Sequence, residues 1–173
     1  MFQEAIAQYL KQNHYESIQL KSVLFDMDGV LFDSMPYHAE AWHKTMKAHG
    51  LNLSREEAYM HEGRTGAGTI NIVCQRQLGR DATQEEIESI YLEKSIEFNK
   101  HPQAERMPGA WELLQKIKAE GIIPTVVTGS GQASLLDRLE HNFPGMFRQE
   151  LMVTAFDVKY GKPNPEPLSL IHI

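Results

Sequence analysis

A short apolar strand that ends in two aspartates constrains this chain more than any other feature. Residues 21–26, KSVLFD, are typical of a buried strand, and a DMDG turn follows directly. Asp26 and Asp28 therefore stand two residues apart at a strand end, where one carboxylate can attack phosphorus and bind a cation while the other handles a proton. A calcium loop can begin with the same letters, but Leu31 and Phe32 follow where such a loop needs further oxygen ligands.

The order of the other elements predicts an α/β fold. Residues 122–128 and 150–154 have the pattern of two more short strands. Helices are expected from Trp111 to a stop at Gly121 and over 132–141. Alternation of strand and helix with short loops is typical of a parallel sheet with right-handed crossovers.

Two further segments have helical periodicity. Residues 3–13 predict an amphipathic helix, which we expect to pack on the outside of the domain, a partner-binding helix being the alternative. Residues 35–105 are helical in pattern, and Thr83 with Glu86 three residues later is typical of a capping box. We therefore expect an all-helical lobe inserted after the first strand, in which the single cysteine, Cys74, serves packing.

Two loops at or after the carboxyl ends of the later strands are candidates for binding an anion. Open α/β sheets bind ligands at the edge formed by these strand ends. The segment Thr128-Gly129-Ser130-Gly131 offers a hydroxyl and backbone N–H groups where a helix begins, although a plain turn capped by Ser130 would look the same. In the segment 161–167, GKPNPEP, three alternate prolines hold Lys162 in a rigid loop. There the lysine can meet both an aspartate and a phosphate oxygen, a surface turn being the alternative.

The three motifs, in this order, resemble those of the haloacid dehalogenase superfamily, and within it the β-phosphoglucomutase-like subgroup with a helical cap. The resemblance runs from about Lys21 to Pro167. It implies a Rossmann-like parallel sheet core formed by residues 21–34 and 106–167. Residues 35–105 would form an inserted helical cap, and residues 1–20 an N-terminal helical extension.

The resemblance also implies a role for each motif. DMDGV matches the first motif, so Asp26 would be the nucleophile and Asp28 the general acid/base. VVTGSG matches the second, which would bind the phosphate through Thr128, Gly129 and Ser130. GKPNPEP matches the third, in which Lys162 would neutralise the nucleophile and the phosphate.

A magnesium ion is implied as well, because an anionic carboxylate must approach an anionic phosphate. The family binds the metal through the side chain of the first aspartate, here Asp26, through the backbone carbonyl of the second, here Asp28, and through an acidic residue of a fourth motif. That motif is not found in this chain, which continues after Pro167 as LSLIHI.

We predict that residues 168–173 are a non-native tail, because LSLIHI is what the transposon end used as a sequencing adaptor would encode. The natural protein is then expected to be longer. Without the family's fourth strand, residues 22–26 would present an apolar, unpaired edge. We therefore expect this chain by itself to be poorly soluble and nearly inactive.

Two residues outside the motifs are candidates for substrate contacts. His38 follows the segment that resembles the family's hinge, and Arg64 lies in a loop, EGRTGAGT, that resembles the cap loop facing the substrate. The alternatives are that His38 packs or faces water and that Arg64 is a solvated surface residue. A mutase needs a cationic cap site for its second phosphate, whereas this loop has one arginine, no lysine, and Glu62 about where the mutase carries a cation.

We therefore expect a magnesium-dependent phosphatase that acts on a sugar phosphate or a similar small monoester. The alternatives are a β-phosphoglucomutase-type mutase and, from another class, a catalytically dead binding module. A net charge of −6 argues against a nucleic-acid partner. One cysteine, no apolar run long enough to cross a membrane and no signal peptide favour a cytoplasmic protein.

Overall fold

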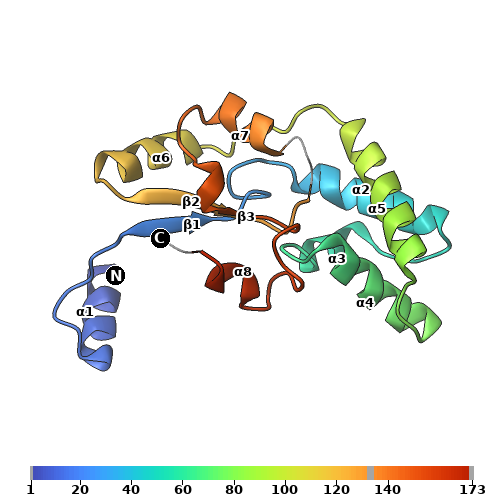
Figure 1. Cartoon of the computed structure of the whole chain (residues 1–173), viewed down its shortest axis with the longest axis horizontal. Coiled ribbons are helices and arrows are strands. Elements are labelled where there is room, and N and C mark those ends of the chain that lie inside the picture. The colour runs from blue at the N-terminus through green and yellow to red at the C-terminus, as the bar shows by residue number, and fades with distance from the viewer. Residues whose placement is uncertain (1, 132–134, 172–173) are drawn as a thin grey trace.

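The computed structural model describes residues 2–131 and 135–171. Its centre is a parallel sheet of β1 (Ser22–Phe25), β2 (Ile123–Val127) and β3 (Met152–Val153), in the order β1-β2-β3 (Figure 1). Phe25 lies beside Val126, and Val126 beside Met152. The predicted α/β class and parallel sheet are confirmed. The third strand is shorter than predicted, because Gln149–Leu151 form a 3-10 turn, η1, before it.

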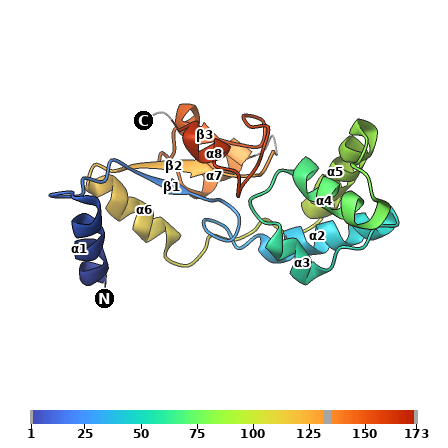
Figure 2. The same ribbon diagram turned by 90° about the horizontal axis from the view of Figure 1, so that it is seen from below.

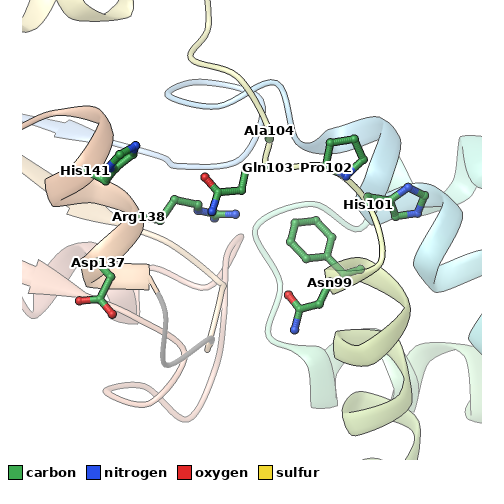
Figure 3. A pocket seen from close by; sticks show the side chains of 9 residues that line it. Asn99, His101, Pro102, Gln103, Ala104, Asp137, Arg138 and His141 are labelled. Atoms are coloured by element: carbon green, nitrogen blue, oxygen red, sulfur yellow. The ribbon is translucent and has the colours of Figure 1, made fainter.

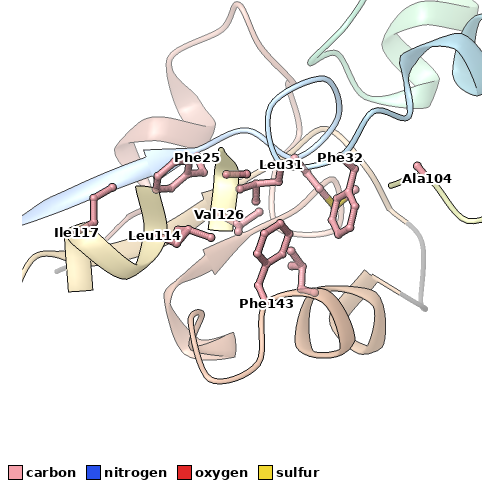
Figure 4. Close-up of a cluster of buried hydrophobic side chains, with 11 residues drawn as sticks. Phe25, Leu31, Phe32, Ala104, Leu114, Ile117, Val126 and Phe143 are labelled. Carbon is pink, nitrogen blue, oxygen red and sulfur yellow. The ribbon is translucent and has the colours of Figure 1, made fainter. Parts of the chain in front are cut away.

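One face of the sheet is covered by α6 (Ala110–Ala119) and α7 (Leu135–Asn142), whose apolar residues pack on the strands (Figures 1 and 4). Helix α6 confirms the helix predicted to end at Gly121. The start of the helix predicted over 132–141 lies outside the described residues. The core cluster consists of Phe25, Met27, Leu31, Phe32, Ala104, Ala110, Leu114, Ile117, Val126, Leu139 and Phe143.

The stretch between β1 and α6 is helical, as predicted. It contains α2 (Met35–Ala48), α3 (Arg55–Met60), α4 (Gly66–Leu78) and α5 (Gln84–Asn99), which together we call the helical lobe. Figure 2 shows this lobe to one side of the sheet. The division into core and cap at residues 34–35 and 105–106 stays a prediction.

The helical lobe has an apolar cluster of its own, which includes Ile70, Ile90 and Cys74. Cys74 is buried, so its predicted packing role is confirmed. The capping box is also confirmed. The Thr83 hydroxyl accepts a hydrogen bond from the Glu86 amide at 3.2 Å, and the Glu86 carboxylate accepts one from the Thr83 amide at 2.7 Å.

Helix α1 (Phe2–Asn13) forms where it was predicted, but the expectation that it packs on the domain is wrong. None of its described residues is buried, and Phe2, Ile6 and Tyr9 on its apolar face are 83%, 50% and 50% exposed. The helix ends before His14, which has a φ of 57°, and an exposed segment leads from there to β1. As a result α1 extends away from the sheet (Figure 1).

The outer edge of β1 has no strand beside it in the described part of the chain, as expected for the first strand. The short helix α8 (Glu166–Ser169) begins within the third motif, and the origin of residues 168–173 stays a prediction. Within the described residues, no helix combines the length and the apolar character needed to cross a membrane.

Candidate active site

Asp26 and Lys162, from the first and third motifs, meet at the carboxyl end of the sheet. Nζ of Lys162 lies 2.8 Å from Oδ2 of Asp26 and donates a hydrogen bond to the carbonyl of Val127, 3.1 Å away. The other carboxylate oxygen of Asp26 accepts a hydrogen bond from the Met27 amide at 2.8 Å. Each of the two charged side chains keeps 24% of its surface exposed.

A tight turn places Asp28 behind this pair. The carbonyl of Met27 accepts hydrogen bonds from the Leu31 and Phe32 amides at 2.9 Å and 3.1 Å, and Gly29 takes a φ of 77° that glycine adopts without strain. The Asp28 carboxylate is buried as a result, with only 4% of its side chain exposed. Its Oδ1 accepts a short hydrogen bond, 2.6 Å, from the hydroxyl of Ser34.

The helical lobe supplies two further groups to Asp28. Nε2 of His38 lies 3.1 Å from Oδ1 of Asp28, although it is not aligned as a hydrogen bond. On the other side of the ring, Nδ1 lies 2.7 Å from Nζ of Lys94. Because an ammonium group can only donate, Nδ1 must accept, and a proton on a neutral ring must then sit on Nε2, facing Asp28.

Burial and neighbouring charges shift the pKa values of Asp28, His38 and Lys94. Burial alone would raise the pKa of Asp28, but His38, Ser34 and Arg138 outweigh burial and lower it to about 2. Burial and the charge of Lys94 lower the pKa of His38. Burial lowers the pKa of Lys94 to about 8, although Asp28 acts in the opposite direction. At neutral pH the arrangement is therefore an ionised Asp28, a neutral His38 and a protonated Lys94.

His38 therefore lies beside Asp28 and stacks on the ring of Phe98, and its predicted contact with the substrate stays a prediction. Lys94 was missed, because its sequence position marks it only as one residue on the inner face of a helix. The signal that could have found it is the spacing of four residues that puts Lys94 on the same helix face as the apolar residues Ile90 and Phe98. A lysine is almost never fully buried without a partner.

The second motif forms a compact loop after β2. The Thr128 amide donates to the carbonyl of Val153 at 2.9 Å, and the Thr128 hydroxyl accepts from the Ser130 amide at 3.1 Å. That hydroxyl therefore keeps its own proton free to donate. The Gly131 amide donates to the hydroxyl of Tyr91 at 3.3 Å, which ties this loop to α5 of the helical lobe.

Two glycines of the motifs allow the lobe to approach closely. A Cβ atom at Gly129 would lie 2.5 Å from the carbonyl oxygen of Arg64, and one at Gly161 would lie 2.4 Å from the Thr65 amide nitrogen. Both distances are too short for real carbon atoms. The loop at residues 63–65 is therefore in direct backbone contact with the second and third motifs.

A pocket between lobe and sheet remains beside Asp28, with a volume of about 40 Å³. That is room for about one water molecule, so a phosphorylated sugar can enter only if the lobe moves away from the core. Arg64 is partly buried on its rim, and its side chain makes no hydrogen bond or ion pair within the described residues. The lining residues are Asp28, His38, Trp42, Ala58, His61, Glu62, Gly63, Arg64, Gly66, Thr69, Tyr91, Lys94, Gly129 and Ser130.

Glu62 is the acidic member of the rim on the lobe side. Its side chain remains exposed at the mouth of the pocket. Desolvation in the crevice, together with the carboxylates of Asp28 and Asp26, nevertheless raises the pKa of Glu62 to about 7. The sequence pointed to this residue, but its proximity to both aspartates emerges only from the fold.

A second cavity, of about 510 Å³, lies where the helical lobe joins the core (Figure 3). The segment 98–104 and helix α7 line it, and Arg138 stands at its centre. The Arg138 guanidinium lies over the ring of Phe32, 4.8 Å from its centre, and 3.8 Å from Oδ1 of Asp28. Arg138 is thus a further cation beside Asp28, 6.0 Å from the ring centre of Phe98 in the helical lobe, and the sequence analysis missed it.

The types of ligand atom present at this site suit a magnesium ion. The Asp26 carboxylate and the Asp28 backbone carbonyl are hard oxygen ligands, and no hydrogen bond within the described residues uses that carbonyl. Magnesium keeps several waters and takes one or two carboxylates together with substrate phosphate oxygens. The described residues contain no group of three or more His, Cys, Asp or Glu side chains that could hold a metal ion unaided.

Comparison with known proteins identifies the family. A sequence model of haloacid dehalogenase-like hydrolases matches residues 20–171, which is most of the chain and includes all three motifs. The chain belongs to this family. The resemblance drawn from the motifs is thereby confirmed.

Relatives agree with this assignment. Hexitol phosphatase A of Escherichia coli is 32% identical over 86% of this chain, and a phosphorylated carbohydrates phosphatase of Thermotoga maritima is 27% identical over 88%. A solved structure from Bacteroides vulgatus, provisionally named a beta-phosphoglucomutase, is 70% identical over 98% of this chain with a TM-score of 0.92. The chain spans 66%, 69% and 69% of the length of these three proteins respectively.

Proposed function

We propose that the protein is a magnesium-dependent phosphatase that removes phosphate from a sugar phosphate or similar monoester through an aspartyl-phosphate intermediate. The observation that carries this proposal is the 2.8 Å contact between Lys162 and Asp26, made at the open end of the sheet and next to a buried Asp28. The phosphatases of Escherichia coli and Thermotoga maritima named above support it.

Asp26 is the group placed to attack. It is partly exposed, and the ammonium of Lys162 offsets the charge repulsion between the carboxylate and the phosphate. We expect the Thr128 hydroxyl and the backbone around Gly129 and Ser130 to bind the phosphate oxygens. A magnesium ion held by Asp26 and the Asp28 carbonyl would add positive charge at the transferring phosphoryl group.

Asp28 is the group that moves protons. With a pKa of about 2 it is ionised in the state described, so it can act as a base that activates water against the aspartyl phosphate. Protonation of the leaving oxygen in the first half-reaction needs a less acidic Asp28. His38, which lowers the pKa of Asp28, belongs to the helical lobe, so movement of the lobe would remove this lowering together with part of the burial that opposes it.

A phosphoglucomutase-type activity is the second candidate, supported by the 70% identity to the Bacteroides vulgatus protein. A mutase must transfer the phosphoryl group to a second hydroxyl and must hold a second phosphate meanwhile. The loop at residues 62–69 offers one cation, Arg64, for that purpose, beside the acidic Glu62. This charge balance is why we favour the phosphatase.

Phosphate release from a panel of sugar and polyol monophosphates with Mg²⁺ tests the proposal. The assay is run on the protein and on its Asp26→Asn variant. Asp33→Asn is the matched control, since Asp33 is an exposed aspartate of the same loop. We expect release that Asp26→Asn abolishes and Asp33→Asn retains.

Binding without release would contradict the phosphatase. Turnover that appears only when a sugar bisphosphate is added as activator would then establish the mutase. Binding without any turnover would leave the non-catalytic module.

A further inference from the structure

Tyr91 is a side chain of the helical lobe whose hydroxyl reaches the core. Its ring belongs to α5, packs against the apolar cluster of the lobe and lies 6.4 Å from the ring of Trp42. Gly66, the first residue of α4, leaves room for the ring, because a Cβ atom at that position would overlap it. These contacts hold the apolar part of Tyr91 within the lobe, while the side chain also lines the pocket beside Asp28.

The backbone amides of the second motif differ in where their acceptors lie. The Thr128 and Ser130 amides donate to acceptors within the core, at 2.9 Å and 3.1 Å. The Gly131 amide donates to the Tyr91 hydroxyl at 3.3 Å, so its acceptor belongs to the lobe. Within the described part of the chain, no acceptor faces the Gly129 amide, which leaves that amide for a ligand.

The contact between Tyr91 and Gly131 depends on the position of the lobe. A phosphorylated sugar enters only when the lobe moves away from the core, and α5 then carries the hydroxyl away from the Gly131 amide. The phosphate-binding loop keeps its two internal hydrogen bonds and loses the third. A loop with fewer constraints samples more conformations, and fixing it again on a ligand costs conformational entropy.

We propose that Tyr91 positions the phosphate-binding loop of residues 128–131, because its hydroxyl holds the Gly131 amide only while the helical lobe is closed. The loop then has its full set of hydrogen bonds in the closed state alone. Phosphate binding and lobe closure therefore favour each other by the same factor. This inference deepens the proposed function and rests on it for the assignment of the phosphate to the second motif.

A phenol suits this position better than an ionised side chain would. Burial raises the pKa of Tyr91, so the hydroxyl stays neutral and accepts from the Gly131 amide while keeping a proton of its own to donate. A carboxylate could accept the same hydrogen bond, but it would place another negative charge beside Asp28 and the phosphate.

Hydrogen exchange at the Gly131 amide reports this contact directly. With ¹⁵N-labelled glycine the protein gives signals from its 12 glycines alone, and the signal that disappears in Gly131→Ala is that of Gly131. The exchange rate is measured with Mg²⁺, with and without inorganic phosphate. Titration calorimetry on the same samples gives the Kd of phosphate.

The variants are Tyr91→Phe and, as the matched control, Tyr59→Phe. Phenylalanine keeps the ring of Tyr91 and its packing in the lobe and removes only the acceptor of the Gly131 amide. Tyr59 is 47% exposed on α3 and does not line the pocket, so its variant makes the same chemical change elsewhere in the lobe.

We expect phosphate to slow exchange of the Gly131 amide in the parent and in Tyr59→Phe, and to leave it unchanged in Tyr91→Phe. The Kd of phosphate should rise roughly fivefold in Tyr91→Phe, the usual contribution of one hydrogen bond. Equal protection of Gly131 by phosphate in Tyr91→Phe and the parent overturns the inference. An unchanged Kd in Tyr91→Phe, or a parent that does not bind phosphate, overturns it as well.

Failure of the proposed function has a different signature. The phosphate-release assay would then show no turnover of any monophosphate, whereas exchange at Gly131 would still respond to phosphate and to the Tyr91 hydroxyl.

Discussion

Nζ of Lys94 lies 2.7 Å from Nδ1 of His38, inside the helical lobe and one ring away from the Asp28 carboxylate. The lysine orients the ring so that its other nitrogen faces Asp28. A buried cation of this kind is costly for the fold, since burial lowers the pKa of Lys94 to about 8 from 10.5. Its presence is explained by the site rather than by stability.

Lys94→Met should therefore change the pH dependence of stability. Between pH 8 and 10.5 the unfolded chain holds a proton on Lys94 that the folded chain has lost, so the free energy of unfolding rises with pH. At about 1.4 kcal/mol per pKa unit this rise is roughly 3 kcal/mol. Urea titrations across this range should show the rise in the parent and in Lys44→Met, an exposed control, and its loss in Lys94→Met.

The same variant should also lose activity, by tenfold or more, because His38 is no longer held toward Asp28. Steady-state phosphate release measures this effect. Equal pH slopes in parent and variant would contradict the burial of a charged Lys94, and full activity would contradict its positioning role.

Gly161→Ala tests the close approach of the lobe to the core. The added methyl group would lie 2.4 Å from the Thr65 amide, and Gly161 does not have the positive φ that would strain alanine. We expect kcat/KM to fall at least tenfold while the midpoint of thermal unfolding changes little, because the clash exists only when the lobe is closed. Gly68→Ala, in the first turn of α4 and near only its own neighbours Thr65 and Arg64, should have a much smaller effect. Kinetic constants within twofold of the parent for Gly161→Ala would show that turnover needs no such closure.

Lys162→Met should reduce phosphate release by about 100-fold or more, since it leaves the Asp26 carboxylate to approach the phosphate without its cation. Lys159→Met removes an exposed lysine three residues earlier and should retain activity. Initial rates at saturating Mg²⁺ compare the two. Similar losses of activity in both variants would mean that the loss of one positive charge, and not the loss of the contact with Asp26, lowers the rate.

The outer edge of β1 should make this 173-residue chain prone to aggregation. Leu24 on that strand is 38% exposed, and an unpaired apolar edge is a template for further strands. Leu24→Lys should lower light scattering at a given concentration. Leu92→Lys, at an exposed leucine of α5, is the control for a gain of charge alone. Equal improvement by both variants would remove the edge as the cause.

The sequence predicted the sheet and the meeting of its motifs well, because strands that are apolar and end in polar turns carry their own signal. Parallel strands end at one edge, so Asp26 and Thr128 had to lie near each other, and the fixed loop of Lys162 could reach them. The packing of α1 could not be predicted in this way. Amphipathic periodicity shows that a helix has an apolar face, but not which surface, if any, covers it.

The contacts that the helical lobe makes in the site could not be predicted from the sequence either. Lys94 and His38 are 56 residues apart, and only the packing of α2 against α5 brings them together. The same holds for Glu62, whose two influential neighbours, Asp26 and Asp28, lie on a different segment. Arg64 stayed ambiguous in the sequence, and the structure places it on the pocket rim without a described partner for its side chain.

Trapping the intermediate on Asp26 tests the aspartyl-phosphate mechanism most directly. The protein is mixed with a turned-over monophosphate and Mg²⁺, quenched within one turnover and treated with borohydride, which reduces an acyl phosphate to the alcohol. Mass spectrometry of the peptide that contains residues 22–34 then locates the reduced side chain. We predict reduction at Asp26, with none at Asp28 and none without substrate. Phosphate release that continues in Asp26→Asn, or an adduct on any other residue, would contradict it.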